Sequence, residues 1–135
     1  MPTPSETVTT FLAQWDRPGG LAQAIRDMFT KATVWDNVGF VSSVGIDQAL
    51  KVLAGFGQDA GSLIMRVETL SLAASGNKVL TERIDHIVDS ASGKPSISFP
   101  VMGIFEVADG KITAWRDYFD TAGFAAQWQG EAKQD

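Results

Sequence analysis

Two aspartates and one arginine in the second half of the chain have the residue types and spacing that acid–base chemistry needs. Arg83 and Asp85 stand two positions apart in a segment rich in β-branched residues. Asp117 lies in a second such segment, two positions from both Trp115 and Phe119. Side chains alternate across a strand, so Arg83 and Asp85 share one face, and Asp117 shares its face with the two aromatic residues. If both faces form the concave side of one sheet, the charged groups converge in a mostly apolar pocket.

Two carboxyl groups beside one guanidinium can differ in protonation, so that one acts as an acid and the other as a base. In a poorly solvated site both carboxyls cannot ionise cheaply, so one holds a proton while the other, paired with Arg83, stays charged. The protonated group can donate to a developing alkoxide, and the ionised group can remove a proton from water. Such a pair could open a strained ether without a metal. An isolated Arg-x-Asp on a strand is more often a structural ion pair, so spacing alone leaves the role open.

The composition narrows the classes of partner and chemistry. The 135 residues fit one domain over residues 1–135, and 44% hydrophobic residues are enough for a buried core. A net charge of -5 disfavours nucleic acid and anionic membranes as partners. The absence of cysteine excludes a thiolate nucleophile and a sulfur-based zinc site. The single histidine, His86, falls on the strand face opposite Arg83 and is assigned no role. No secretory or membrane-spanning pattern is visible, which predicts a cytoplasmic protein.

Helical periodicity predicts the first half of the chain. Thr3-Pro4-Ser5-Glu6 is typical of a capping box that starts a helix. A second helix is expected over residues 21–29, and a third from about Ile46 to Phe56, ending at Gly55 and Gly57. One short strand, residues 33–38, interrupts the helices.

Long strands are predicted for the second half. Asp109-Gly110 is a strong two-residue hairpin signal, and Asp120 can cap a short closing helix that contains Phe124. The predicted strands cover residues 63–73, 78–89, 97–108 and 111–120. The expected fold is therefore α+β, with N-terminal helices packed on a strongly curved, mostly antiparallel sheet that forms a conical barrel around an internal apolar pocket.

Two motifs together resemble the limonene epoxide hydrolase family. They are Thr-Glu-Arg-Ile-Asp at residues 81–85 and Trp-Arg-Asp-Tyr-Phe-Asp at residues 115–120, and residues 103–105 and 109–113 fill the interval as they do in the family. The resemblance runs from the first helix to Phe124. It implies a dimeric, cofactor-free hydrolase on the nuclear-transport-factor-like α+β cone, which converts hydrophobic epoxides to vicinal diols in one step.

The resemblance also implies residue roles. Asp117 corresponds to the base that deprotonates water, Asp85 to the acid that protonates the epoxide oxygen, and Arg83 to the bridge between them. The family holds its water with a tyrosine and an asparagine two positions apart; here Asn37 is present and Trp35 replaces the tyrosine. An indole offers one N–H donor and no acceptor, so water positioning, substrate size or the activity itself can differ.

The expected partners are water and a small hydrophobic, cyclic or terpene-like epoxide, with a homodimer and without metal or cofactor. The side chains expected to contact the substrate are Met28, Phe105, Trp115, Phe119 and Phe124. A ketosteroid isomerase-like or polyketide cyclase-like enzyme on a similar cone is an alternative, but it needs an enolate-stabilising donor, and Tyr118 faces away from Asp117 by strand parity. A non-catalytic hydrophobic-ligand carrier is the second alternative.

Overall fold

The computed structural model describes residues 1–55 and 62–133, with side chains described as far as residue 128. The described elements are, in chain order, α1 (Pro4–Ala13), α2 (Gly20–Met28), β1 (Phe29–Asn37), β2 (Val41–Val44), α3 (Gly45–Ala54), β3 (Ile64–Ser75), β4 (Lys78–Val88), β5 (Pro95–Ala108), β6 (Lys111–Phe119) and α4 (Thr121–Lys133). Within this part of the chain, no helix is long and apolar enough to cross a bilayer.

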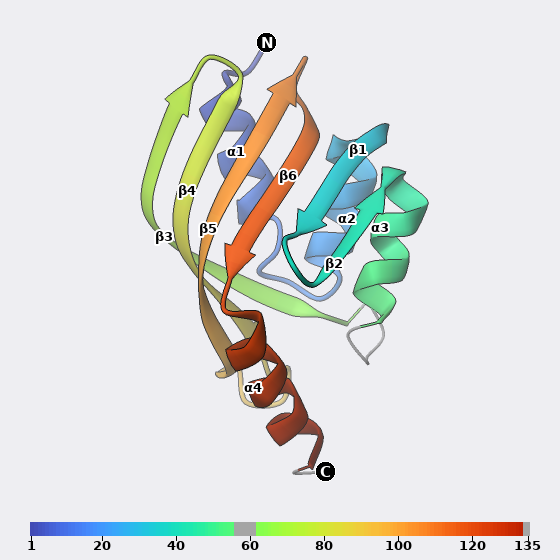
Figure 1. Ribbon diagram of the computed structural model, residues 1–135, viewed down its shortest axis with the longest axis vertical. Helices are drawn as coiled ribbons and strands as arrows, with labels where there is room; N and C mark the ends of the chain where they lie inside the picture. The colour runs from blue at the N-terminus through green and yellow to red at the C-terminus, as the bar shows by residue number, and fades with distance from the viewer. Residues whose placement is uncertain (56–61, 134–135) are drawn as a thin grey trace.

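The strands form one curved sheet in the order β2-β1-β6-β5-β4-β3. All neighbouring strands are antiparallel except β1 and β6, which run parallel. In Figure 1, α1, α2 and α3 cover one face of the sheet, and α4 continues from its lower end. The predicted α+β architecture is confirmed, with one refinement: β2 and β3 remain separate edges in the described structure, so the sheet is an open cone and not a closed barrel.

Local sequence signals explain several element ends. The Thr3 hydroxyl accepts a hydrogen bond from the Glu6 amide, and the Glu6 carboxylate accepts one from the Thr3 amide, which completes the capping box. Asp109 and Gly110 both have positive φ, 52° and 75°, as a two-residue hairpin turn with the matching twist requires.

Other element bounds differ from the sequence prediction. β1 begins at Phe29 rather than at residue 33, because the chain passes directly from α2 into the strand. The four-residue β2 was not predicted, since so short an edge strand has little periodicity of its own. α3 is described to Ala54, and the end predicted at Phe56 and Gly57 lies outside the described residues.

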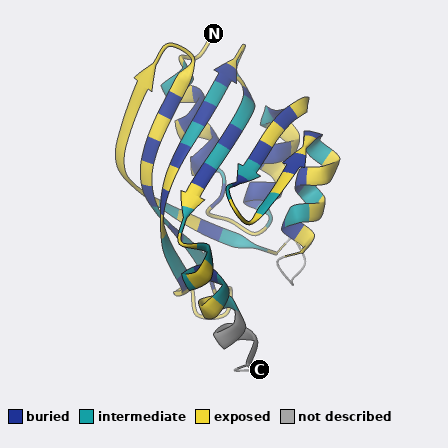
Figure 2. Ribbon diagram, in the orientation of Figure 1, coloured by how far each residue is buried: buried dark blue, intermediate teal, exposed yellow. Residues whose placement is uncertain are grey.

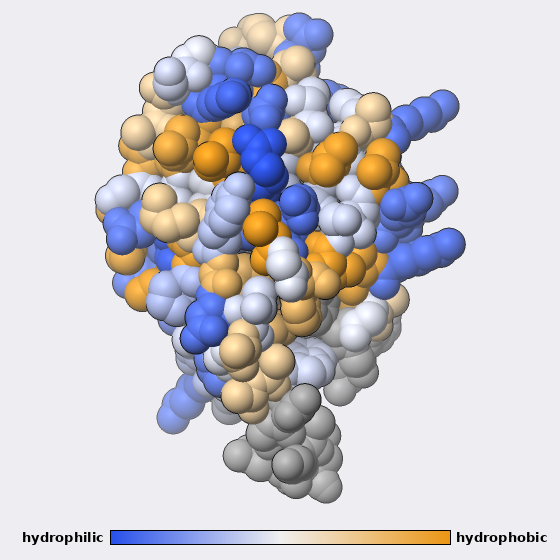
Figure 3. Space-filling view, in the orientation of Figure 1, coloured by the Kyte–Doolittle hydropathy of each residue, from blue (hydrophilic) through white to orange (hydrophobic). Residues whose placement is uncertain are grey.

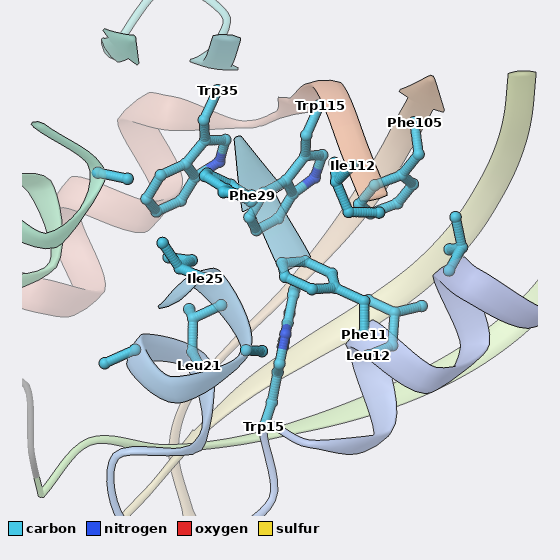
Figure 4. Close-up of a cluster of buried hydrophobic side chains, with 14 of the residues drawn as sticks. Phe11, Leu12, Trp15, Leu21, Ile25, Phe29, Trp35, Phe105, Ile112 and Trp115 are labelled. Carbon is cyan, nitrogen blue, oxygen red and sulfur yellow. The ribbon is translucent and has the colours of Figure 1, made fainter. Parts of the chain in front are cut away.

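The core lies between the helices and the concave face of the sheet, where burial alternates along the strands (Figure 2). Its centre is a group of aromatic rings from α1, from the turn that follows it and from facing strands, drawn in Figure 4. The Phe11 ring packs edge-on against Trp15 and Trp115, with ring centroids 5.7 Å and 5.3 Å away. Phe105 and Trp115 stack from neighbouring strands at 5.4 Å. These rings form an apolar wall beside the charged residues of β4 and β6.

Candidate active site

The charged residues singled out in the sequence meet in the interior of the cone. Arg83 and Asp85 on β4 are 0% and 2% exposed, and Asp117 on β6 is 5% exposed. β5 runs between these strands, and its Gly103 is paired with both Thr81 and Asp117. Charges are rarely buried to this degree unless they are paired and hydrogen-bonded.

Arg83 is the centre of the cluster, because each of its five N–H donors has a partner. Its Nε and Nη2 donate to Oδ1 and Oδ2 of Asp85 at 3.0 Å and 2.8 Å. Its Nη1 and Nη2 donate to Oδ1 and Oδ2 of Asp117 at 3.2 Å and 2.9 Å. The remaining donor reaches the Thr81 hydroxyl at 3.0 Å, and that hydroxyl donates to the Gly103 carbonyl. The guanidinium therefore holds both carboxylates in fixed orientations.

Gly103 makes room for this arrangement. A Cβ at this position would collide with Nη1 of Arg83 and Oδ1 of Asp117. Any other residue would push apart the ion pair that joins β4 to β6. The glycine was not assigned a role from the sequence, although a glycine inside a strand is the usual signal of a close approach.

Asp117 has an additional partner, because the indole Nε1 of Trp115 donates to its Oδ1 at 2.7 Å. Burial raises the pKa of Asp117, the negative charge of Asp85 raises it further, and the opposing contributions of Arg83 and Trp115 leave the pKa above its ordinary value. Burial lowers the pKa of Arg83, but the charges of Asp117 and Asp85 outweigh this effect and the guanidinium remains charged.

The Trp115 hydrogen bond gives a direct test of this electrostatic account. Trp115→Phe keeps an aromatic ring and removes the donor, so we expect the pKa of Asp117 to rise further, because the lost bond favours the charged form. Carboxyl carbon NMR during a pH titration measures the shift. Trp35→Phe is the matched control, since the two indoles stack at 4.7 Å and Trp35 Nε1 has no partner in the described structure. Equal shifts in both variants would contradict the assignment.

A small cavity opens beside the two carboxylates, with a volume of about 50 Å³. This is room for a few water molecules. Its lining is mostly apolar and includes Trp15, Leu21, Trp35, Asn37, Leu53, Leu63, Met65, Asp85, Ile87, Phe99, Trp115, Asp117, Phe119 and Phe124. We call it the inner cavity.

Trp35 and Asn37 border the inner cavity from β1. They are the register partners of Trp115 and Asp117 across the parallel strand pair. Trp35 Nε1 and Asn37 Nδ2 are buried and make no hydrogen bond in the described structure. Two buried donors without acceptors beside a carboxylate are suited to a bound molecule that supplies lone pairs, such as water.

The structure separates the expected substrate contacts into two groups. Trp115, Phe119 and Phe124 line the inner cavity, whereas Met28 and Phe105 are absent from its lining. Phe105 is fully buried beneath the cluster, with its ring centroid 5.8 Å from the guanidinium carbon of Arg83, and therefore belongs to the core. Met28 lies at the end of α2, where its sulfur accepts a hydrogen bond from Gln14. A helical stripe predicts burial, but it does not distinguish core from cavity wall.

The inner cavity also has lining residues that were not assigned from the sequence, among them Met65 and Ile87. His86 lies on the other side of β4, where its Nδ1 pairs with the Ser98 hydroxyl at 2.7 Å. The described histidine and acidic residues form no group of three that could hold a metal ion.

The fold and the site define a class of protein: an open α+β cone with an arginine-bridged pair of buried carboxylates at its apolar centre. A protein of ketosteroid isomerase-like fold from Catenulispora acidiphila superposes with a TM-score of 0.67, covering 95% of both chains, at 19% identity. At that identity the likeness establishes the fold alone.

The family is shown by the sequence. Residues 2–129 match the limonene-1,2-epoxide hydrolase catalytic domain, and the chain belongs to this family. A Mycobacterium tuberculosis epoxide hydrolase, EphG, is 39% identical over 87 residues, which are 64% of this chain and 54% of the relative, so the match spans about half of that protein. The structure of a limonene epoxide hydrolase-like epoxide hydrolase from M. tuberculosis superposes with a TM-score of 0.71 at 28% identity, covering 94% of this chain and 90% of that one.

Proposed function

We propose that the protein is an epoxide hydrolase that converts a small hydrophobic, cyclic or terpene-like epoxide to a vicinal diol without a cofactor. The observation that carries the proposal is the pair of buried carboxylates, Asp85 and Asp117, which share the Arg83 guanidinium at the edge of an apolar cavity. Membership in the limonene epoxide hydrolase family supports the same activity. An apolar cavity favours a hydrophobic substrate, and the paired carboxyls supply an acid and a base.

The proposed reaction is a single displacement. Water transfers a proton to Asp117 as its oxygen attacks one epoxide carbon, that carbon's bond to the epoxide oxygen breaks, and the oxygen takes a proton from Asp85. Hydrogen bonding supports the assignment of Asp117 as base and Asp85 as acid. Asp117 accepts hydrogen bonds from Arg83 and Trp115, whereas Asp85 accepts them from Arg83 alone, and each such bond favours the ionised form of a carboxyl group. Burial raises the pKa of Asp117, so this group acts as a base at a pH above that pKa, where its carboxylate binds the proton of water more strongly than an ordinary aspartate does. Return of the proton from Asp117 to Asp85 completes the cycle.

Isotope labelling tests the reaction. Cyclic and aryl epoxides are incubated with the enzyme in ¹⁸O-water for a single turnover, and the diol is analysed by mass spectrometry. We expect label in the diol in the first turnover, both with and without a metal chelator. Unlabelled diol with the label in Asp117 would show a covalent ester instead. If no epoxide gave a diol but the same compounds bound tightly, the non-catalytic hydrophobic-ligand carrier would be favoured.

The isomerase and cyclase alternatives have less support from the site. Tyr118 is 47% exposed on the outer face of the sheet, so the only tyrosine of the chain cannot polarise a carbonyl beside Asp117. Formation of a rearranged ketone, rather than a diol, is the outcome that would favour them.

We also propose a homodimer formed through the outer face of the sheet. Figure 3 shows hydrophobic side chains on this face, between hydrophilic ones. Leu80, Met102 and Tyr118 are 39%, 51% and 47% exposed, and Met102 is the register partner of Tyr118. An apolar face on one side of a sheet can pair with a second copy of itself about a two-fold axis.

The dimer has a test of its own. Met102→Glu places a charge within the apolar face and is expected to shift the molar mass measured by light scattering from two chains to one. Lys94→Glu, in the loop before β5, is the control. A wild-type mass of one chain at micromolar concentration would refute the dimer and leave the proposed reaction unaffected.

A further inference from the structure

A second hollow lies next to the inner cavity, and the two have one side chain in common. We call it the outer groove; its volume is about 480 Å³. Its described lining consists of Phe40, Val41, Lys51, Val52, Gly55, Phe124, Ala125 and Trp128. Phe124 lines both spaces. Ligand pockets usually measure about 300–1,000 Å³, so the inner cavity alone is too small for a substrate and the two spaces together are large enough.

The Phe124 ring forms the partition between the two spaces. On the inner side its centroid lies 4.9 Å from Phe99 and 5.8 Å from Phe119. On the outer side it lies 5.8 Å from Phe40 and 6.2 Å from Trp128. The ring is 4% exposed, so it is held within this group of aromatic residues. Phe124 is therefore the described side chain at which the outer groove and the inner cavity adjoin.

The helix that carries Phe124 is anchored to the rest of the protein. Asp120 accepts a hydrogen bond from the Gly123 amide at the start of α4. The Gln127 amide group exchanges two hydrogen bonds with the backbone of Ser98 on β5, at 3.2 Å and 3.0 Å. These contacts fix the first turns of α4, which places Phe124 where it lines both spaces and Ala125 where it lines the groove.

We propose that the outer groove is the second half of the substrate site, and that it holds the distal apolar part of an elongated epoxide ending in a carboxylate. This proposal rests on the proposed hydrolase reaction, with the epoxide ring beside Asp85 and Asp117, and it extends the substrates from small cyclic or terpene-like epoxides to elongated ones. The described lining of the groove is apolar except for Lys51, which is exposed on α3. An exposed ammonium group among otherwise apolar lining residues favours a chain with an anionic end.

A matched pair of variants on α4 tests the groove. Ala125→Trp fills it, whereas Ala126→Trp places the same ring on the exposed side of the helix. The measured quantity is kcat/KM for a long-chain terminal epoxide divided by kcat/KM for cyclohexene oxide. We expect this ratio to fall at least about tenfold in Ala125→Trp, because the indole displaces about two methylene groups of the long chain from the groove. In Ala126→Trp the ratio should change less than about twofold.

Lys51→Met tests the selection of the anionic end. The substrates are two linear terminal epoxides of equal chain length, one ending in a methyl group and one in a carboxylate. We expect the preference for the carboxylate to fall by about threefold, the size typical of an exposed ion pair, while Lys78→Met on β4 leaves it unchanged. An unchanged preference in Lys51→Met would overturn the anionic end.

Two results would separate the groove from the hydrolase. Turnover of both epoxides with an unchanged ratio in Ala125→Trp would overturn the groove and leave the hydrolase intact. Absence of all turnover would overturn the hydrolase, and calorimetry with dodecanoate then decides on the groove. Weaker dodecanoate binding in Ala125→Trp than in Ala126→Trp would support the groove as a binding site, and equal binding would refute it.

Discussion

Asp117→Asn is expected to lower kcat for epoxide hydrolysis by about a thousandfold or more, because the amide cannot accept the proton of the attacking water. Asp117 lies in the inner cavity, with three hydrogen bonds from Arg83 and Trp115 fixing its carboxylate. Asn is nearly isosteric, so the loss measures proton transfer rather than shape. Steady-state diol formation under saturating epoxide provides the comparison.

Asp85→Asn is expected to cause a loss of similar size, because the epoxide oxygen then leaves as an alkoxide without a proton donor. Asp36→Asn is the matched control: Asp36 lies on β1 between Trp35 and Asn37, and strand alternation turns it to the opposite face. It should retain activity within about twofold. Near-normal turnover in either Asp85→Asn or Asp117→Asn would remove that residue from the mechanism.

The stability of Asp117→Asn gives an independent check that its fold is intact. Burial raises the pKa of Asp117 in the folded protein above its ordinary value of 3.8. At a pH between 3.8 and the raised pKa, folding is therefore accompanied by uptake of a proton. The wild-type protein therefore loses stability as the pH rises through this interval, whereas the amide has no such dependence. We expect the melting temperature of the variant, relative to wild type, to increase with pH from about 4 upward, by up to about 5 °C per pH unit. A decreasing difference would contradict the raised pKa.

Strand alternation was enough to predict which side chains share a face, and this is why Arg83, Asp85 and Asp117 were found from the sequence. Two inputs were enough to predict that these side chains converge: the alternation of side chains along each strand and the assumption that the sheet is curved. The role of Gly103 depends on how closely the side chains of Arg83 and Asp117 approach its backbone from the two neighbouring strands. No local sequence pattern encodes that distance.

The cavity walls were harder to predict for a related reason. Phe105 and Phe119 have the same hydrophobic character and the same strand context, yet one is fully buried under Arg83 and the other borders the cavity. The difference is depth along a curved sheet, and hydrophobic periodicity carries no information about depth. The Trp115 donor was missed because an indole in an apolar pattern is usually a core residue.

The water site on β1 gives the second large expected effect. Asn37 faces Asp117 across the strand pair, and its Nδ2 lacks a partner in the described structure. A water molecule between these groups would donate one hydrogen to Asp117 and accept a hydrogen bond from Nδ2 of Asn37, leaving one lone pair for the epoxide carbon. Loss of one positioned polar contact made in the transition state typically costs about a hundredfold in rate. Asn37→Ala should therefore lower kcat by about that factor.

Trp35 has a smaller expected contribution, because its ring already stacks on Trp115 at 4.7 Å and forms part of the cavity wall. Trp35→Tyr exchanges one donor for another and should stay active; Trp35→Phe removes the donor, so the difference between these two variants measures the value of the indole N–H. If Trp35→Tyr abolished turnover while Asn37→Ala left it unchanged, the water would not be held at this strand. β1 would then serve only to shape the space in which the substrate binds.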